Sequence, residues 1–226
     1  MKWIPRAMVF ALAACAASAS GQTSVGLSVY GAFSGTTTGN GTAQSPANQA
    51  GGLIELRHIA NPIFGFEATY SFNRADQTYK TDLNDALCPA PGCSLGTEPV
   101  PANAHEFTAD WVPSLRVGNL RPFGVLGAGA LVDVPAESQA TITYTSPCGV
   151  NFCPAGPLTL SSPTSTSVEA VYVYGAGLDW GLLPHLGLRL QYRGNLYHAP
   201  DVSQAFSSTD SFMHTAEPMI GAYFSF

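Results

Sequence analysis

Seven segments of this chain alternate apolar and polar side chains with the period of a β-strand and an eighth is apolar throughout, and this repetition limits the fold more than any other feature. The clearest is residues 63–73 (IFGFEATYSFN), where a row of aromatic side chains lies opposite Glu67 and several hydroxyl-bearing residues. The same alternation appears in the ranges 23–35, 52–59, 104–115, 168–182, 187–197 and 214–226, whereas 121–134 is apolar on both faces and its facing stays open. An all-β fold is therefore predicted.

The connections between these segments alternate in length. They run long, short, long, short, long, short, long, and the long ones are rich in Gly, Thr, Ser, Asn and Pro. In an up-and-down barrel with both termini on one side, all odd-numbered connections emerge on the opposite side, where length is free. Most segments match the roughly 9–11 residues that a tilted strand needs to cross hydrocarbon.

The last thirteen residues (HTAEPMIGAYFSF) indicate where the apolar faces point. Ile220, Ala222, Phe224 and Phe226 share one face of a strand, while Glu217 and Tyr223 share the other. An apolar terminal strand with nothing after it to cover that face suits contact with lipid. The ending Tyr223, Phe224 and Phe226 resembles the C-terminal sorting signal of bacterial outer-membrane barrels.

With this ending and topology, the chain resembles the small eight-stranded outer-membrane β-barrel family, which includes the transmembrane domain of OmpA and OmpX-like proteins. The resemblance implies an eight-stranded antiparallel up-and-down transmembrane β-barrel with short periplasmic turns and four long extracellular loops, spanning residues 22–226. It also implies location in the bacterial outer membrane, contact with outer-membrane lipid, and assistance from the barrel-assembly machinery during biogenesis.

The N-terminal segment 1–21 is expected to be a cleaved signal peptide. Lys2 and Arg6 precede an apolar stretch, and Ala17-Ser18-Ala19 supplies the small residues of a cleavage site. An alternative is a lipobox, Leu12-Ala13-Ala14-Cys15, with acylation of the cysteine. Both interpretations export the chain.

Composition excludes two classes of protein. Hydrophobic residues make up 46% and charged residues only 11%, which excludes a disordered chain. Acidic residues number 15 against 9 basic ones, and loss of the signal removes two of the latter. This acidic balance argues against nucleic acid as a partner.

Nine charged residues are predicted to point into the barrel lumen. They are Glu55, Arg57, Glu67, Glu106, Asp110, Asp179, Arg189, Arg193 and Glu217. One interpretation is a salt-bridged plug, because an isolated buried charge costs several kcal/mol. The other is a gate in which Arg189 or Arg193 exchanges carboxylate partners, giving a narrow pore that prefers cations because acids outnumber bases.

Cysteines occur as two C-x4-C pairs in separate long connections. We expect disulfides involving Cys88 and Cys93 in one connection and Cys148 and Cys153 in another, with pairing across the two as the alternative. A zinc site is the rival interpretation, but zinc normally requires closer spacing and four converging ligands.

The remaining motifs give no catalytic, metal or cofactor site. The G-A-G motifs at Gly127–Gly129 and Gly175–Gly177 lack the third glycine of a dinucleotide fingerprint and suit a crowded, curved wall instead. His198, Asp201 and Ser203 lie close in sequence, yet no oriented base or oxyanion donor accompanies them. His105 and His214 are expected at the barrel mouth or membrane interface.

The sequence thus predicts a non-enzymatic outer-membrane barrel without cofactors, with a structural or surface-interaction role, such as adhesion or recognition, carried by its loops. Alternatives are the narrow pore and a lipid-modifying barrel enzyme. A soluble lipocalin-like barrel would need an early G-x-W motif, whereas the first tryptophan after Trp3 is Trp111. The extracellular ligand is not encoded in any motif.

Overall fold

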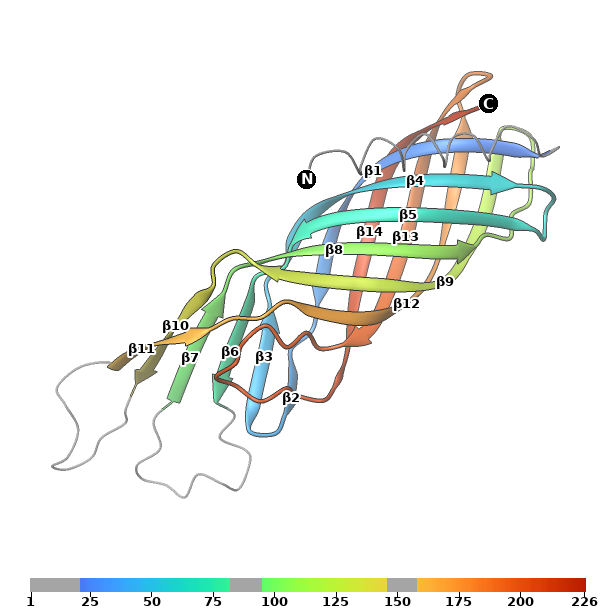
Figure 1. Cartoon of the computed structure of the whole chain (residues 1–226). Coiled ribbons are helices and arrows are strands. Elements are labelled where there is room, and N and C mark those ends of the chain that lie inside the picture. Colours follow the sequence, from blue (N-terminus) through green and yellow to red (C-terminus); the bar gives the residue numbers. More distant parts are fainter. Residues whose placement is uncertain (1–20, 82–94, 146–157) are drawn as a thin grey trace, which may run out of the picture.

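A computed structural model describes residues 21–81, 95–145 and 158–226 of the chain. In this part, fourteen strands form a closed barrel and a separate six-stranded sheet that projects from one end of it (Figure 1). No helix among the described residues is long and apolar enough to cross a membrane.

The barrel is antiparallel throughout and has eight strands. They are β1 (Gln22–Ser34), β4 (Gln49–Ile59), β5 (Gly65–Arg74), β8 (Ala102–Trp111), β9 (Leu120–Pro135), β12 (Ser167–Gly181), β13 (Leu186–His198) and β14 (Phe212–Ser225). Each pairs with its neighbour in sequence order, and β1 closes the circle by pairing with β14, with Ser24 opposite Ser225. The predicted eight-stranded up-and-down barrel is therefore confirmed.

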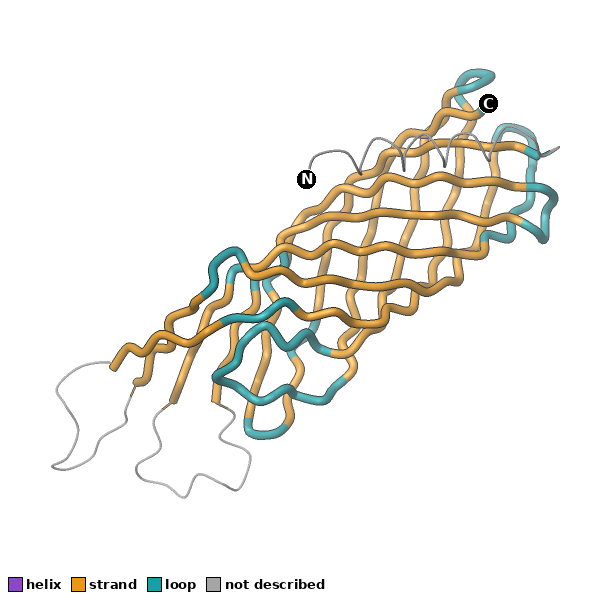
Figure 2. Tube along the Cα trace, viewed as in Figure 1, coloured by secondary structure: helices purple, strands orange, loops and turns teal. Residues whose placement is uncertain are grey.

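The six-stranded sheet continues the barrel hairpins beyond short breaks. It consists of β2 (Thr37–Gly39), β3 (Thr42–Pro46), β6 (Gln77–Thr81), β7 (Leu95–Val100), β10 (Gln139–Thr145) and β11 (Leu158–Pro163), in the order β11-β10-β7-β6-β3-β2. We call it the outer sheet; Figure 2 shows it at the end of the barrel away from the C-terminus. The first three long connections are thus not merely polar loops, because their threonine-rich stretches pair as strands.

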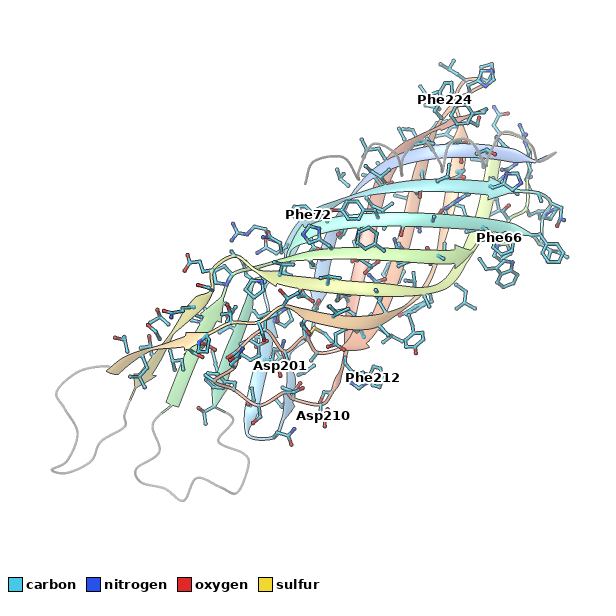
Figure 3. The ribbon with its side chains drawn as sticks, in the orientation of Figure 1. Phe66, Phe72, Asp201, Asp210, Phe212 and Phe224 are labelled. Carbon is cyan, nitrogen blue, oxygen red and sulfur yellow. The ribbon has the colours of Figure 1, made fainter. Side chains whose placement is uncertain are left out.

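The apolar row of each barrel strand faces outward. Phe66, Trp111 and Phe224 are 57%, 40% and 48% exposed, and Figure 3 shows Phe66, Phe72 and Phe224 on the outside of the ribbon. Polar and charged residues occupy the interior instead. This arrangement fits a barrel wall that contacts acyl chains.

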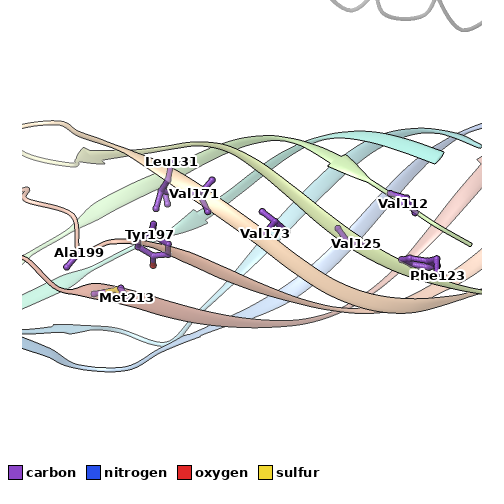
Figure 4. Close-up of a cluster of buried hydrophobic side chains, with 10 residues drawn as sticks. Val112, Phe123, Val125, Leu131, Val171, Val173, Tyr197, Ala199 and Met213 are labelled. Atoms are coloured by element: carbon purple, nitrogen blue, oxygen red, sulfur yellow. The ribbon is translucent and has the colours of Figure 1, made fainter. Parts of the chain in front are cut away.

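Strand β9 contributes apolar side chains to the interior. Phe123, Val125 and Leu131 point inward while Leu126 points outward, which resolves the facing that the sequence leaves open. The inward members pack with Val171 and Val173 of β12, along the barrel axis (Figure 4).

Glycines let the wall of the barrel curve tightly at the G-A-G motifs. A Cβ on Gly129 would overlap the carbonyl oxygen of Phe107, and one on Gly175 would overlap that of Tyr192. Both positions therefore require glycine for close backbone approach.

Candidate functional site

The structure places all nine predicted lumen charges inside the barrel. Each is nearly inaccessible, from 0% exposure for Arg193 to 4% for Glu217. They belong to six different strands, so the network ties distant parts of the wall together. The charges form two tiers, one near the short turns (the turn end) and one near the outer sheet (the sheet end).

The turn-end tier contains two arginines and three carboxylates. Arg57 Nε donates to Glu67 Oε2 at 2.6 Å, and Arg57 Nη1 donates to Asp179 Oδ2 at 3.3 Å. Arg189 binds Asp179 with two bonds of 2.6 and 2.8 Å and also pairs with Glu55. Bidentate geometry of this kind is among the stronger hydrogen-bonding arrangements in proteins.

Aromatic rings flank the same arginines. The Arg57 guanidinium carbon lies 4.1 Å from the centre of the Phe123 ring, and that of Arg189 lies 5.3 Å from it. Tyr223, predicted as part of the terminal sorting motif, points inward and its ring lies 5.2 Å from Arg189. Phe224 and Phe226 lie outside and pack edge to face at 5.4 Å.

The sheet-end tier is organised around a single arginine. Arg193 Nη2 donates to Glu106 Oε1 at 2.9 Å and contacts the Thr108 hydroxyl at 3.3 Å. In the strand ladder Arg193 lies directly opposite Glu217. Asn195 donates to the second oxygen of Glu106 at 2.8 Å, so this carboxylate is held on both sides.

The predicted set of nine charges omits several interior residues that contribute to the site. Phe123 and Asp133 lie on β9, whose two apolar faces gave no basis for choosing the inward one. Thr69, Thr108 and Asn195 are neutral, and only their parity with neighbouring charges distinguishes them.

Cavities lie at both ends of the barrel interior. The turn-end cavity, about 280 Å³, is lined by Arg57, Arg121, Asp179 and Tyr223 among others. The sheet-end cavity is much smaller, about 40 Å³, and is bordered by Glu106, Asp133 and Glu217 among others. The two share no lining residue.

The connection between β13 and β14, residues 199–211, packs against the outer sheet. The Tyr79 hydroxyl donates to the Pro200 carbonyl at 2.7 Å and accepts from the Val202 amide at 3.2 Å. The Ser203 hydroxyl donates a hydrogen bond to Glu98, a completely buried residue of β7. Burial raises the pKa of the Glu98 carboxyl, and the bond from Ser203 opposes this only in part.

The histidines and the sequence-adjacent His198, Asp201 and Ser203 have separate environments. The His198 ring packs at a tilt against Phe212, with ring centres 4.2 Å apart, and across the described part of the chain no hydrogen bond joins these three residues to one another. His105 and His214 instead bond to the hydroxyls of Tyr70 and Tyr174, at 2.9 and 2.8 Å. Cys88, Cys93, Cys148 and Cys153, and residues 1–20 with Cys15, lie outside the described residues.

Comparisons with solved structures found small membrane barrels. Ail of Yersinia pestis, solved with the heparin analogue sucrose octasulfate, is 18% identical over 91% of this chain and 99% of Ail, with a TM-score of 0.42. Neisserial surface protein A is 13% identical over 90% of this chain and 97% of its own chain, with a TM-score of 0.47. OprG from Pseudomonas aeruginosa is 10% identical over 91% of this chain and 96% of its own chain, with a TM-score of 0.48. A search of curated protein sequences gave no significant match.

A family model described as "Outer membrane protein beta-barrel domain" matches residues 7–211, which is most of the chain. The match agrees with the closed eight-stranded barrel, its outward apolar faces and its charged interior. The turn end is accordingly periplasmic and the sheet end extracellular. This chain therefore belongs to the outer-membrane β-barrel domain family and resides in the bacterial outer membrane.

Proposed function

We propose that this protein is a closed membrane anchor whose outer sheet and extracellular connections bind a ligand outside the cell, in adhesion or recognition. One observation carries the proposal: the barrel hairpins continue as a six-stranded sheet beyond the barrel, while paired charges cross the barrel lumen. The barrel supplies the rigid base, and the outer sheet supplies the surface.

The lumen network acts as a plug in this proposal. Each of Arg57, Arg189 and Arg193 contacts at least one carboxylate and is almost inaccessible. Breaking a buried pair leaves an uncompensated charge and costs about 3–5 kcal/mol. Exchange of partners is therefore disfavoured unless water enters the lumen.

The outer sheet offers a surface for recognition. Among the described residues, its edge strand β11 has β10 as its one partner strand, and Thr159, Leu160 and Ser161 on it are exposed. On the other side, its last residue Pro163 accepts a bond from the Gln204 amide. An open strand edge presents unpaired backbone groups to a partner.

Replacement of residues 139–163 by a short Gly-Ser turn tests the proposal. Bacteria displaying the intact protein or this variant are compared for binding to a panel of immobilised extracellular-matrix proteins and glycans. The variant is expected to lose binding while its barrel still migrates compactly in SDS until heated. Equal binding by both, or no binding by the intact protein, contradicts the proposal.

A narrow cation-preferring pore is the second candidate, since carboxylates outnumber arginines in the lumen. Planar-bilayer recordings distinguish it from the anchor. The anchor predicts no steady conductance, whereas stepwise openings with a cation-selective reversal potential favour the pore.

We assign no catalytic step to this protein. A lipid-modifying activity would change the mass spectrum of lipid A when the gene is deleted, and the proposal expects the two spectra to be the same.

We also propose that residues 1–21 are removed on export, leaving 22–226 as the barrel domain, and that the cysteine pairs form local disulfides. N-terminal sequencing of the purified protein tests the first point, with acylated Cys15 as the contrary outcome. Peptide mass mapping without reduction tests the second, and peptides linked between the two cysteine-containing connections would contradict local pairing.

A further inference from the structure

The periplasmic mouth of the lumen carries two arginines that lie directly opposite each other. The connection between β8 and β9 ends in a tight hairpin, in which Val117 and Leu120 exchange both backbone hydrogen bonds, at 2.8 and 3.1 Å. The next pair along this ladder is Arg116 and Arg121, at a position without backbone bonds, where the side chains of two strands come closest. Like charges that face each other across two strands are destabilising.

Neither of these two arginines has a carboxylate of its own. Asp179 lies opposite Arg121 in the ladder between β9 and β12. Both of its carboxylate oxygens already accept bonds from Arg189, and Arg57 shares one of them. Among the described residues, no ion pair involves Arg116 or Arg121. With both included, the turn-end tier holds four cations against three carboxylates, so an anion is missing at the mouth.

The facing arginines border a cavity with room for such an anion. Arg116 and Arg121 both line the turn-end cavity of about 280 Å³, which is open to the periplasm because Arg116 at its border is exposed. Tyr223 reaches the same space from β14, and its hydroxyl has no hydrogen-bond partner among the described residues. A Cβ on Gly181 would lie 3.9 Å from that hydroxyl and 3.6 Å from the Asn119 carbonyl oxygen of the hairpin. The Tyr223 hydroxyl therefore lies near the turn that carries both arginines.

We propose that the turn-end cavity binds a phosphate group from the periplasm between Arg116 and Arg121. Each guanidinium is a planar fork of donors that fits phosphate oxygens, and a tetrahedral phosphate has enough oxygens for two forks and the Tyr223 hydroxyl. A carboxylate has two oxygens, so one arginine would engage both and leave the other unpaired. The cavity is slightly smaller than small-molecule pockets of about 300–1,000 Å³, which suits a soluble phosphate ester or the headgroup of an inner-leaflet phospholipid.

The test uses the full chain purified in dodecyl maltoside, a detergent without phosphate. Inorganic phosphate is titrated at low ionic strength, and its binding is measured by isothermal titration calorimetry. Arg116→Gln and Arg121→Gln are each expected to weaken binding by about tenfold or more, because each removes a charge-assisted fork of donors. Arg74→Gln is the matched control, since it removes an exposed arginine at the sheet end and should leave binding unchanged. Acetate should bind the parent protein about tenfold more weakly than phosphate, because it engages only one fork.

Thermal unfolding in the same detergent, followed by circular dichroism, separates a binding role of the two arginines from a structural one. Without phosphate, Arg116→Gln and Arg121→Gln each remove repulsion between like charges, so they should unfold at the same temperature as the parent or a higher one. Phosphate should raise the unfolding temperature of the parent and the control but not of these variants, because only the folded state binds it. Compact migration in SDS confirms that each variant folds.

Native mass spectrometry distinguishes the two sources of phosphate. Retention of added phosphatidylglycerol by the parent, with loss in both variants, identifies a lipid headgroup as the occupant. Binding of inorganic phosphate without retention of the lipid identifies a soluble phosphate ester. The proposal is overturned if neither binds, if both arginine variants bind like the parent, or if acetate binds as tightly as phosphate.

Discussion

At the scale of single residues, Arg193 organises the extracellular half of the interior. Its side chain is fully buried, bonds to Glu106 at 2.9 Å and faces Glu217 in the ladder. The sequence could place Arg193 inside, because its strand alternates cleanly. It could not place Asp133 inside, because β9 is apolar on both faces. It also could not show that Arg57 pairs with Asp179, because these residues come from strands far apart in sequence.

The substitution Arg193→Met tests this role. Methionine keeps much of the length but leaves Glu106 without its cation, so the free energy of unfolding should fall by about 3–5 kcal/mol. Urea unfolding in lipid vesicles measures the change. Arg74→Met is the control, because Arg74 pairs with Asp76 at the surface and its loss should cost about 1 kcal/mol or less. Equal losses for both variants would rule out a special role for Arg193.

Glu98 gives the packing of residues 199–211 a dependence on pH. Because burial raises the pKa of Glu98 in the folded state, its contribution to stability is present at acidic pH and is lost as pH rises through that pKa. Hydrogen exchange of the Val202 and Gln204 amides, corrected for intrinsic rates, should therefore slow as pH falls. Burial also raises the pKa of Asp201, so the variant Glu98→Gln isolates the part due to Glu98 and should exchange with a shallower pH dependence. An unchanged dependence in that variant would show that Glu98 is not the titrating group.

At the scale of elements, the barrel strands were predictable and the outer sheet was not. Alternation marks a strand only when one face is apolar, and β2, β3 and β6 have few apolar residues on either face. What stabilises them is pairing with neighbouring hairpins and the covering connection 199–211, which local sequence does not reveal. Val202 of that connection is fully buried against Tyr79 and Val100.

Removal of one hydroxyl should loosen this connection. Tyr79→Phe deletes the bonds to Pro200 and Val202. The Pro200 carbonyl keeps the bond that Gln44 Nε2 donates at 2.9 Å, so the Val202 amide is the group left without its partner, which corresponds to about 1–3 kcal/mol of local stability. Limited proteolysis of intact cells should then cleave within residues 199–211 faster than in the parent protein, while heat-modifiable migration of the barrel is retained. Tyr172→Phe, on an exposed outward ring, is the control and should leave cleavage unchanged. Unaltered cleavage in Tyr79→Phe would mean that other contacts hold the connection.

At the scale of the whole molecule, the outward apolar surface determines where the barrel resides. The sequence could predict it because every barrel strand except β9 repeats the same parity, and closure by β1 and β14 leaves no free barrel edge. The charged interior follows from the same parity, whereas the two end cavities depend on side-chain packing that no periodicity contains.

Charge substitutions at two exposed leucines distinguish the lipid-facing wall of the barrel from the water-exposed outer sheet. Leu190→Arg places a charge on the outer wall of β13 and should lower the free energy of unfolding in vesicles by up to about 2–4 kcal/mol, the cost of an arginine facing lipid near the bilayer midplane. Leu160→Arg makes the same change on β11 of the outer sheet, where water solvates the charge, and should have little effect. Urea titration in vesicles measures both. Similar effects at the two positions would contradict the membrane boundary placed between barrel and outer sheet.

The continuation of the barrel hairpins into the outer sheet also has a mechanical consequence. A pull on a hairpin tip by an attached surface would run nearly along the strands, across cross-strand bonds that lie perpendicular to them. Such loading shears many bonds together instead of opening them in succession. The outer sheet should accordingly resist a pulling force while the barrel anchors it in the bilayer.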